Sequence, residues 1–337
     1  MSIGSEPTVV VVGATGVVGE EVLAVLAERD FPTVEVRALA SSASAGLRVS
    51  FGASEVTVRT VTDDAFAGAG VVFLCAGAAV SERYAERLAA AGVLVVDLSD
   101  RFVTDAAVPV VAPEVNLRAV AARGGVRLVS VAGAAAGALA AVLHPLDGAA
   151  GLRAITVTTL EPASMHGRPG VAELGEQAAA LLSGREASAE VFPRQLAFNC
   201  IPAIGALDAG GQTHAERMLQ CGLCRLLDRR DLAVAATAVQ VPTFFGLGAA
   251  VTIELERPLG AEAAQAVLRG APSVIVNDGE AYATTFDAVG SDAVHVSRIR
   301  AHGDRPGCLG LWIAVDNTRK AAATNAVVIA EALLPGA

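Results

Sequence analysis

The sequence contains few aromatic residues and no long uninterrupted apolar run. Aromatic side chains make up 4% of the 337 residues, whereas hydrophobic residues of all kinds make up 53%, so Ala, Val and Leu must build the core. No apolar stretch reaches the roughly 18 residues that suggest a membrane-spanning helix. The first seven residues lack the positive charge of a secretory signal. We therefore expect no membrane partner.

Positive charge is scarce as well. The chain has 25 Lys and Arg against 35 Asp and Glu, a net charge of −10, which argues against a nucleic-acid partner. The five cysteines are an odd number spread through a large chain, which fits free thiols in a reducing, cytoplasmic setting. Cys221 and Cys224 have C-x-x-C spacing, but no second pair completes four zinc ligands. We expect no metal.

A glycine turn near the start organises the chain. Residues 8–12 are Thr and four valines, which is typical of a strand buried on both faces of a parallel sheet. Gly13, Gly16 and Gly19 follow, and then apolar residues recur at helical spacing. In a variant of the Rossmann turn, these glycines would allow a tight turn, backbone approach to a pyrophosphate, and close packing of helix on strand. The pattern predicts a nucleotide site at the helix start; a purely structural turn is the alternative.

Strands and helices alternate up to about residue 130, which predicts a doubly wound α/β domain. The expected strands are 34–40, 56–61, 71–75 and 93–97, with a helix over 80–91 and an extended segment at 108–116. An alanine-rich helix over 133–143 should end before Pro145. Longer alternating strands at 155–160, 233–241 and 249–256 then indicate a largely antiparallel sheet in a second α+β domain. After a strand at 309–315, a last helix over 320–334 could return to the first domain.

The second strand ends in small hydroxyl residues. In a dinucleotide fold, an Asp or Glu at this point would bind the ribose of NAD, but none is present. Ser41, Ser42 and Ser44 suit the 2′-phosphate of NADP instead, although no arginine stands among them. A polar turn without a ligand explains the serines equally well.

Five segments together resemble aspartate-semialdehyde dehydrogenase over nearly the whole chain. They are residues 13–19, 39–46, 108–116, 192–202 and 312–331. The resemblance implies a Rossmann-type domain over 1–130 plus 318–337, and a dimerisation and substrate domain over 131–317. It also implies a homodimer whose interface is the sheet of the second domain. The family converts an acyl phosphate to an aldehyde through a cysteine thioester, with a histidine moving protons and NADP carrying hydride.

The resemblance also implies which residues would hold NADP or NAD. They lie in the glycine turn, in the serine loop and near the last helix: Gly13, Thr15, Gly16, Val17, Val18, Ser41, Ser42, Ser44, Asn317 and Asn325. The arginine that the family carries in the serine loop is Ala43 here.

The family's catalytic positions are degenerate in this chain. The nucleophilic cysteine corresponds to Ala134, and the proton-moving histidine corresponds to Leu247. The glutamine after the next strand becomes Glu161, and the substrate arginine becomes Gln240. An alanine methyl group cannot form a thioester, and a leucine cannot move a proton. The pattern resembles the USG-1-type branch of the family, which lacks the catalytic cysteine, and predicts a catalytically inactive protein.

This chain also differs from the family at the positions that bind the anionic groups of the substrate. The phosphate-binding arginine aligns with Val103, two residues from Arg101. The family's substrate-binding glutamate and lysine correspond to His214 and Arg217. The alternative is an active NAD(P)-dependent oxidoreductase that uses different residues or a different substrate. For that alternative His166, five residues after Glu161, is a weak candidate for an acid–base residue.

Overall fold

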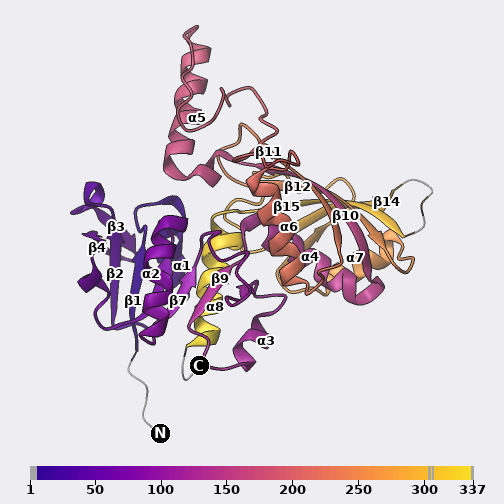
Figure 1. Ribbon diagram of the computed structural model, residues 1–337. Coiled ribbons are helices and arrows are strands. Elements are labelled where there is room, and N and C mark those ends of the chain that lie inside the picture. The colour runs from indigo at the N-terminus through magenta and orange to yellow at the C-terminus, as the bar shows by residue number, and fades with distance from the viewer. Residues whose placement is uncertain (1–5, 303–304, 306, 335–337) are drawn as a thin grey trace. The chain divides into compact units, whose positions relative to one another are not determined.

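The computed structural model describes residues 6–302, 305 and 307–334 (Figure 1). Most of the segment considered above for a secretory signal lies outside the described residues, which begin at residue 6. The last three residues, assigned above to the first domain, also lie outside them. Unit 1 comprises the chain up to Gly133 and from Ala322 onward, and unit 2 comprises Ala134–Ala321. In the described part of the chain, no helix is long and apolar enough to cross a membrane.

Unit 1 contains a seven-stranded sheet in the order β5-β2-β1-β6-β7-β9-β8, and every strand pair in it is parallel. Runs of buried valine form its centre, because each face of the sheet is covered. A separate hairpin of β3 and β4 packs beside α1. The strands are β1 Thr8–Val12, β2 Glu35–Ala40, β3 Arg48–Phe51, β4 Ser54–Thr57, β5 Arg59–Thr60, β6 Ala69–Leu74, β7 Leu94–Asp97, β8 Val110–Val111 and β9 Leu128–Val131.

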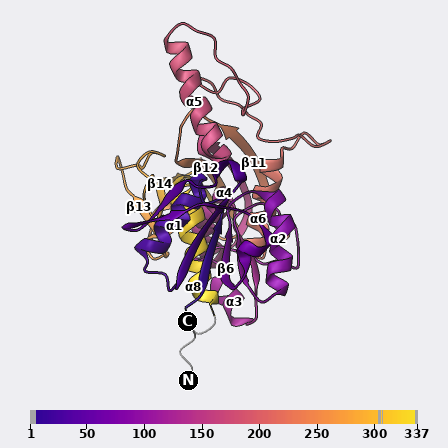
Figure 2. The same cartoon turned by 90° about the vertical axis from the view of Figure 1, so that its left-hand side faces the viewer.

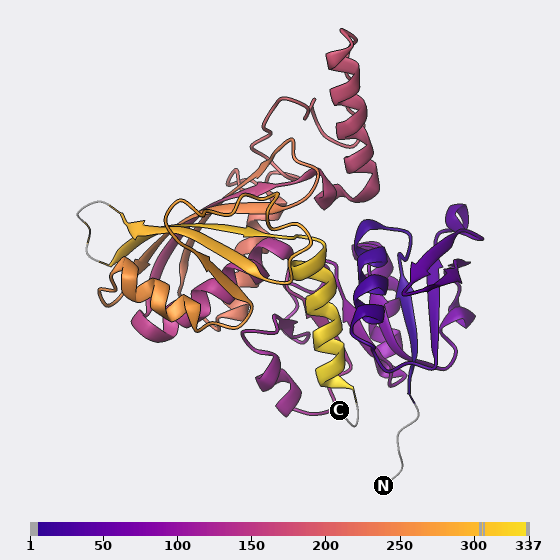
Figure 3. The same ribbon diagram turned by 180° about the vertical axis from the view of Figure 1, so that it is seen from behind.

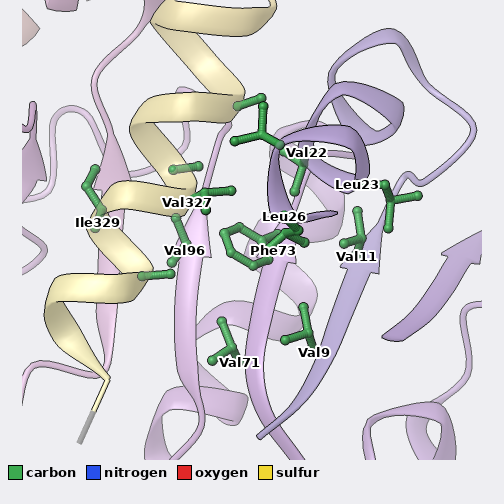
Figure 4. Packing of buried hydrophobic residues seen from close by; sticks show 14 of the residues in the cluster. Val9, Val11, Val22, Leu23, Leu26, Val71, Phe73, Val96, Val327 and Ile329 are labelled. Atoms are coloured by element: carbon green, nitrogen blue, oxygen red, sulfur yellow. The ribbon is translucent and has the colours of Figure 1, made fainter. Parts of the chain in front are cut away.

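Helices cover both faces of this sheet, with α1 and α8 on one side and α2 on the other (Figure 2). In Figure 4, Val22 and Leu26 of α1 and Val327 of α8 point toward Phe73 of β6. The core is therefore built mainly from aliphatic side chains. The helices are α1 Val17–Glu28, α2 Ala78–Ala90, α3 Leu117–Ala122 and α8 Asn325–Leu333.

Unit 2 contains a six-stranded mixed sheet in the order β11-β10-β12-β15-β14-β13. The two outer pairs are parallel and the three inner pairs are antiparallel. The sequence predicted a largely antiparallel sheet. Three of the five strand pairs are antiparallel, and the two parallel outer pairs make the sheet mixed. The strands are β10 Leu152–Glu161, β11 Ala233–Gln240, β12 Leu247–Leu255, β13 Val274–Asn277, β14 Val294–Ala301 and β15 Cys308–Val315.

Helices α4, α6 and α7 lie along one side of the unit 2 sheet, while α5 stands away from it (Figures 1 and 3). Helix α6 begins with a capping box, in which the Thr213 hydroxyl accepts from the Glu216 amide and the Glu216 carboxylate accepts from the Thr213 amide. The helices are α4 Ala134–Ala150, α5 Gly167–Leu182, α6 His214–Leu226 and α7 Ala261–Arg269.

Several predicted boundaries were wrong. Helix α4 does not end before Pro145 but continues through it to Ala150, since burial of Leu143 and Leu146 outweighs the missing proline N–H. Only Val110–Val111 of the extended segment 108–116 joins the sheet. The last helix is preceded by a π-helical segment, Arg319–Thr324.

Candidate functional site

The glycine turn follows β1 at the point where the strand order of the unit 1 sheet reverses, between β1 and β6. Gly13 has φ +83°, and a Cβ there would lie 2.7 Å from the carbonyl oxygen of Cys75, just after β6. A Cβ on Gly19 would lie 2.1 Å from the carbonyl oxygen of Gly13. Both positions therefore require glycine. Ligands of open parallel sheets bind at such switch points.

Helix α1 begins directly after this turn, with Gly16 as its N-cap. Among the described residues no side chain caps this helix end. No N-cap side chain therefore covers the first amide groups of the helix, those of Val17 and Val18. Because a helix start combines such N–H groups with the positive end of the helix dipole, this end favours an anion such as a phosphate.

The serine loop lies beside the glycine turn. Thr15 Oγ1 donates to Ser44 Oγ at 3.3 Å, which brings together two segments 29 residues apart. Ser41 and Ser42 are exposed at the start of a single 3₁₀ turn. The hydroxyl groups expected near a dinucleotide thus gather at one end of the unit 1 sheet.

The two asparagines proposed for the cofactor lie in different units. Asn325 is buried at the start of α8 in unit 1. Asn317 belongs to unit 2, where its Oδ1 accepts from the Gly246 amide at 3.0 Å and its Nδ2 donates to Ser164 Oγ at 3.0 Å. The Asn317 side chain therefore links two loops of unit 2.

Three of the four degenerate catalytic positions form one row at the end of the unit 2 sheet. In the parallel pair of β10 and β11, Glu161 lies opposite Gln240. In the antiparallel pair of β10 and β12, the last paired residues are Leu160 and Gly248. One residue further along each strand, Leu247 lies beside Glu161. Paired residues direct their side chains to the same face of a sheet. We call Gln240, Glu161 and Leu247 the terminal row. Ala134, the fourth position, is the first residue of α4.

The carboxyl group of Glu161 is almost completely removed from water, with an exposure of 6% for the residue. Thr159 Oγ1 donates to Glu161 Oε1 at 3.0 Å. Burial raises the pKa of Glu161, and the bond from Thr159 opposes that shift only in part. Leu247, fully buried on the neighbouring strand, adds no polar group to stabilise the charge.

Gln240 connects this carboxyl residue to His166. Its Nε2 donates to the backbone carbonyl oxygen of Glu161 at 2.7 Å, and its Oε1 lies 2.9 Å from His166 Nε2. The edge of the His166 ring packs on Phe192, with 5.0 Å between ring centroids. The structure thus brings the weak candidate His166 to the terminal row. The sequence contained no signal for this contact, because the two residues are 74 positions apart.

The other candidate residues have structural partners. Val103 is buried, and Arg101 lies over the Phe102 ring, 5.1 Å from its centroid. Arg217 pairs with Asp208 at 3.0 Å. Among the described residues, no three His, Cys, Asp or Glu side chains form a group that could hold a metal ion.

A second buried carboxyl group, Asp97, lies at the end of β7 in unit 1. Its Oδ1 accepts from Ser81 Oγ at 2.5 Å and from Ser99 Oγ at 3.0 Å. Burial raises the pKa of Asp97 to about 6 despite these bonds. Burial, and secondarily the charge of Asp97, also raises the pKa of Cys75 far above that of a reactive thiol. Cys75, which is half-buried against the unit 1 core, is therefore not a reactive thiol.

Comparisons with known proteins agree with this architecture. Two family models match in succession: "Semialdehyde dehydrogenase, NAD binding domain" over residues 8–123 and "Semialdehyde dehydrogenase, dimerisation domain" over residues 143–320. The USG-1 protein homolog of Pseudomonas aeruginosa is 39% identical over 332 residues, which cover 98% of each chain. The aspartate-semialdehyde dehydrogenase of Legionella pneumophila is 38% identical over 332 residues, covering 96% of this chain and 95% of the relative.

A solved structure is similar over the same length. Aspartate semialdehyde dehydrogenase II from Vibrio cholerae, crystallised with ASA, superposes with a TM-score of 0.94 at 35% identity, covering 97% of this chain and 98% of that one. A parallel sheet with a glycine turn, followed by a mixed-sheet unit, defines a two-unit α/β protein of the Rossmann type. More particularly, the chain belongs to the semialdehyde dehydrogenase family. The resemblance and the fold class expected from the sequence are confirmed.

Proposed function

We propose that this chain is a dinucleotide-binding, USG-1-type member of the family that does not carry out the family's thioester chemistry. The observation that carries the proposal is the terminal row, in which Glu161 lies between Gln240 and Leu247. This row contains no arginine to hold an anionic substrate and no histidine at position 247. With Ala134 at the start of α4, the position of the nucleophile lacks a thiol.

Residues of unit 1 would hold the cofactor. The amides of Val17 and Val18, after Gly13 and Gly16, would bind the pyrophosphate, and Thr15 would order the adjacent loop through Ser44. Ser41 and Ser42 would lie near the adenosine ribose, where an NAD-selective carboxylate is missing. Asn325, also in unit 1, completes this set. A bound nicotinamide would supply hydride chemistry, and NADP and NAD are both candidates.

The domain assignment belongs to the same proposal. Residues 1–130 with 318–337 would bind the dinucleotide, and residues 131–317 would form the dimerisation and substrate-type domain. The matched models support this assignment by their descriptions, NAD binding and dimerisation.

An activity assay tests the absence of catalysis. The purified protein is mixed with aspartate semialdehyde, phosphate and NADP, and reduction of NADP is followed. We expect no turnover above the protein-free rate, and the double variant Ala134→Cys, Leu247→His serves as the comparison. Turnover by the unmodified chain at enzymatic rates would favour the alternative, an active oxidoreductase that uses His166 and Glu161. Exchanging each of these two residues would then have to abolish the activity.

Calorimetric titration with NADP and NAD tests the cofactor separately. We expect binding to the unmodified chain and a large loss of affinity in Gly16→Val, because a Cβ at position 16 already lies 3.2 Å from the carbonyl oxygen of Gly13 and the branched methyl groups would crowd the pyrophosphate. If neither dinucleotide binds at millimolar concentration, the turn is only a structural remnant.

We also propose a homodimer formed through the open face of the unit 2 sheet. A depression of about 550 Å³ on this face is lined by Leu311, Trp312 and Tyr282 among others. Tyr282 is 56% exposed and Phe286 82% exposed, and such exposed apolar surface supports an interface. Sedimentation equilibrium should give twice the chain mass, and Tyr282→Asp with Phe286→Asp should shift it toward one chain. A single-chain mass for the unmodified protein at micromolar concentration would refute the dimer.

A further inference from the structure

The hairpin of β3 and β4 in unit 1 has an outer edge without a neighbouring strand. In the described part of the chain, β3 pairs with β4 alone, and the two strands form a sheet of their own. The backbone groups on the other side of β3 therefore lack ladder partners there. Proteins either protect such edges or use them to bind an added strand.

The hydrogen-bond pattern of the hairpin shows which residues present their backbone groups at this outer edge. Just before β3, the carbonyl oxygen of Leu47 accepts from the amide of the directly opposite residue, Val58, at 2.8 Å. A bond between opposite residues marks a hydrogen-bonded pair of an antiparallel ladder, and such pairs alternate with non-bonded ones. Along β3, the N–H and C=O groups of Arg48 and Ser50 must therefore point away from β4.

A groove of about 470 Å³ lies between β3 and helix α1. It is lined on one side by β3 with the turn that follows, and on the other by Glu20, Ala24, Ala27 and Glu28 of α1. The two sides come close together, since a Cβ added to Gly52 would lie 3.4 Å from the Ala27 Cβ. The groove thus combines a strand edge with a helix side that carries small residues between two carboxylates.

The helix side of the groove is acidic. Glu20 and Glu28 are exposed, and at the rise of an α-helix they lie about 12 Å apart along α1. Arg48 also lines the groove, but its charge is paired with that of Glu55 across the hairpin at 3.0 Å. In an extended peptide, residues four positions apart share a face and are about 13 Å apart. Two basic residues at that spacing would match the two glutamates.

We propose that this groove binds an extended, basic segment of a partner protein, which adds as a strand to the outer edge of β3. Its backbone would bond the N–H and C=O groups of Arg48 and Ser50, and two basic side chains would lie near Glu20 and Glu28. A second copy of this chain fits less well, because pairing of two β3 edges would bring two acidic α1 helices together. The proposal goes beyond the function proposed above, since it requires neither dinucleotide binding nor catalysis.

Fluorescently labelled heptapeptides test the charge of the partner. The basic probe is Thr-Lys-Thr-Val-Thr-Lys-Thr with capped ends, which places both lysines and the valine on one face of a strand. The control probe has glutamate in place of both lysines. Binding to the full-length protein, without dinucleotide, is measured by fluorescence anisotropy. We expect only the basic probe to bind at up to millimolar protein, and equal binding of the two, or no binding of the basic probe, would overturn the proposal.

N-methylated forms of the basic probe test the addition of a strand. In an added strand, the N–H groups of alternate residues point toward β3 and the others point away from it. One form is N-methylated at its second and fourth residues, and the other at its third and fifth. We expect one form to lose at least about tenfold in affinity and the other to lose little; the sensitive form identifies the direction of the strand. Equal affinities would show that the backbone does not pair, and would overturn the proposal.

Charge variants of the protein locate the site. Glu20→Gln combined with Glu28→Gln should reduce the affinity for the basic probe about fivefold, which is typical of the loss of two exposed ion pairs. Glu82→Gln combined with Glu86→Gln, at exposed positions of α2, removes the same amount of charge and should change the affinity little. Equal effects of the two double variants would place the peptide elsewhere and overturn the proposal.

A proline at the edge of β3 tests the same contact from the protein side. Ser50→Pro removes an N–H group that points away from β4, and proline is accepted at such edge positions. We expect it to reduce the affinity for the basic probe at least about tenfold, whereas Ser50→Ala should bind the probe normally. The N-methylated probes decide the question without any variant if Ser50→Pro disturbs the hairpin. A lower sedimentation mass for Ser50→Pro than for the unmodified protein would mean that a second copy occupies the edge, which would overturn the proposal.

Discussion

Gln240 holds the end of β10 by donating from its side chain to the backbone carbonyl oxygen of Glu161 at 2.7 Å. The same side chain accepts from His166, and its backbone forms two bonds with Ile201. Gln240 therefore joins a strand end, a loop and a histidine within unit 2. At the position where the family resemblance implies an arginine, this chain has a neutral side chain whose amide nitrogen and amide oxygen both make hydrogen bonds.

We expect Gln240→Leu to destabilise unit 2 by about 1–3 kcal/mol, because it leaves the His166 N–H without its acceptor and deletes a buried bond to Glu161. Trp312, the chain's single tryptophan, lies in unit 2 and makes its unfolding visible by fluorescence in urea. Thr237→Leu, at an exposed position of the same strand, is the control and should change stability by less than about 0.5 kcal/mol. Equal losses in the two variants would contradict this account.

Two glycine-to-alanine exchanges should have effects of opposite sign. In Gly19→Ala the new Cβ would meet the Gly13 carbonyl oxygen, so we expect a loss of about 1–3 kcal/mol. Gly148 is exposed in α4, and a Cβ there meets no atom of the described structure within 4 Å, so Gly148→Ala should gain about 0.5–1 kcal/mol from helix propensity. Hydrogen exchange of the α1 and α4 amides, respectively, measures each effect. A neutral Gly19→Ala would show that the turn can relax.

Unit 1 could be predicted largely from its sequence, and unit 2 only in part. The buried valines of β1 and the glycine spacing after them are local signals, and they also indicated where the turn lies. Helix α5 was not predicted from the sequence, because Gly167, Gly170 and Gly175 lower its intrinsic helix propensity. The terminal row required strand pairings between segments far apart in the chain, and no periodicity reports such pairings.

Contacts with a distant segment compensate for the weak propensity of α5. The Glu173 carboxylate accepts from the amides of Glu190, Val191 and Phe192. One turn later, Gln177 Oε1 accepts from the amides of Leu196 and Ala197. Both side chains are buried. These five bonds attach the irregular segment 190–197 to the helix.

We therefore expect Glu173→Ala to release this segment without unfolding the rest of unit 2. Three backbone amides lose a charged acceptor, so their hydrogen exchange should accelerate at least about tenfold. Limited proteolysis should cut between residues 184 and 200, while the Trp312 fluorescence transition changes little. Glu176→Ala, at an exposed position of the same helix, should leave both measurements unchanged. A large shift of the Trp312 transition would mean that α5 and the sheet unfold together.

Asp97 should make the stability of unit 1 depend on pH. Its pKa is about 6 in the folded chain, compared with about 3.9 for an ordinary Asp in the unfolded chain. Between these values the folded state binds more protons than the unfolded state, so this group lowers stability as pH rises from about 4 to above 6. Asp97→Asn cannot ionise, yet its amide oxygen can still accept from Ser81 and Ser99.

The measured quantity is the free energy of unfolding of the variant minus that of the unmodified protein, which removes the contributions of other groups. We expect this difference to increase by about 2 kcal/mol between pH 4 and pH 7. Hydrogen exchange of the β6 and β7 amides is a suitable measurement, because unit 1 contains no tryptophan. A difference that stays constant over this range, or decreases with pH, would show that Asp97 is not a buried acid with a raised pKa.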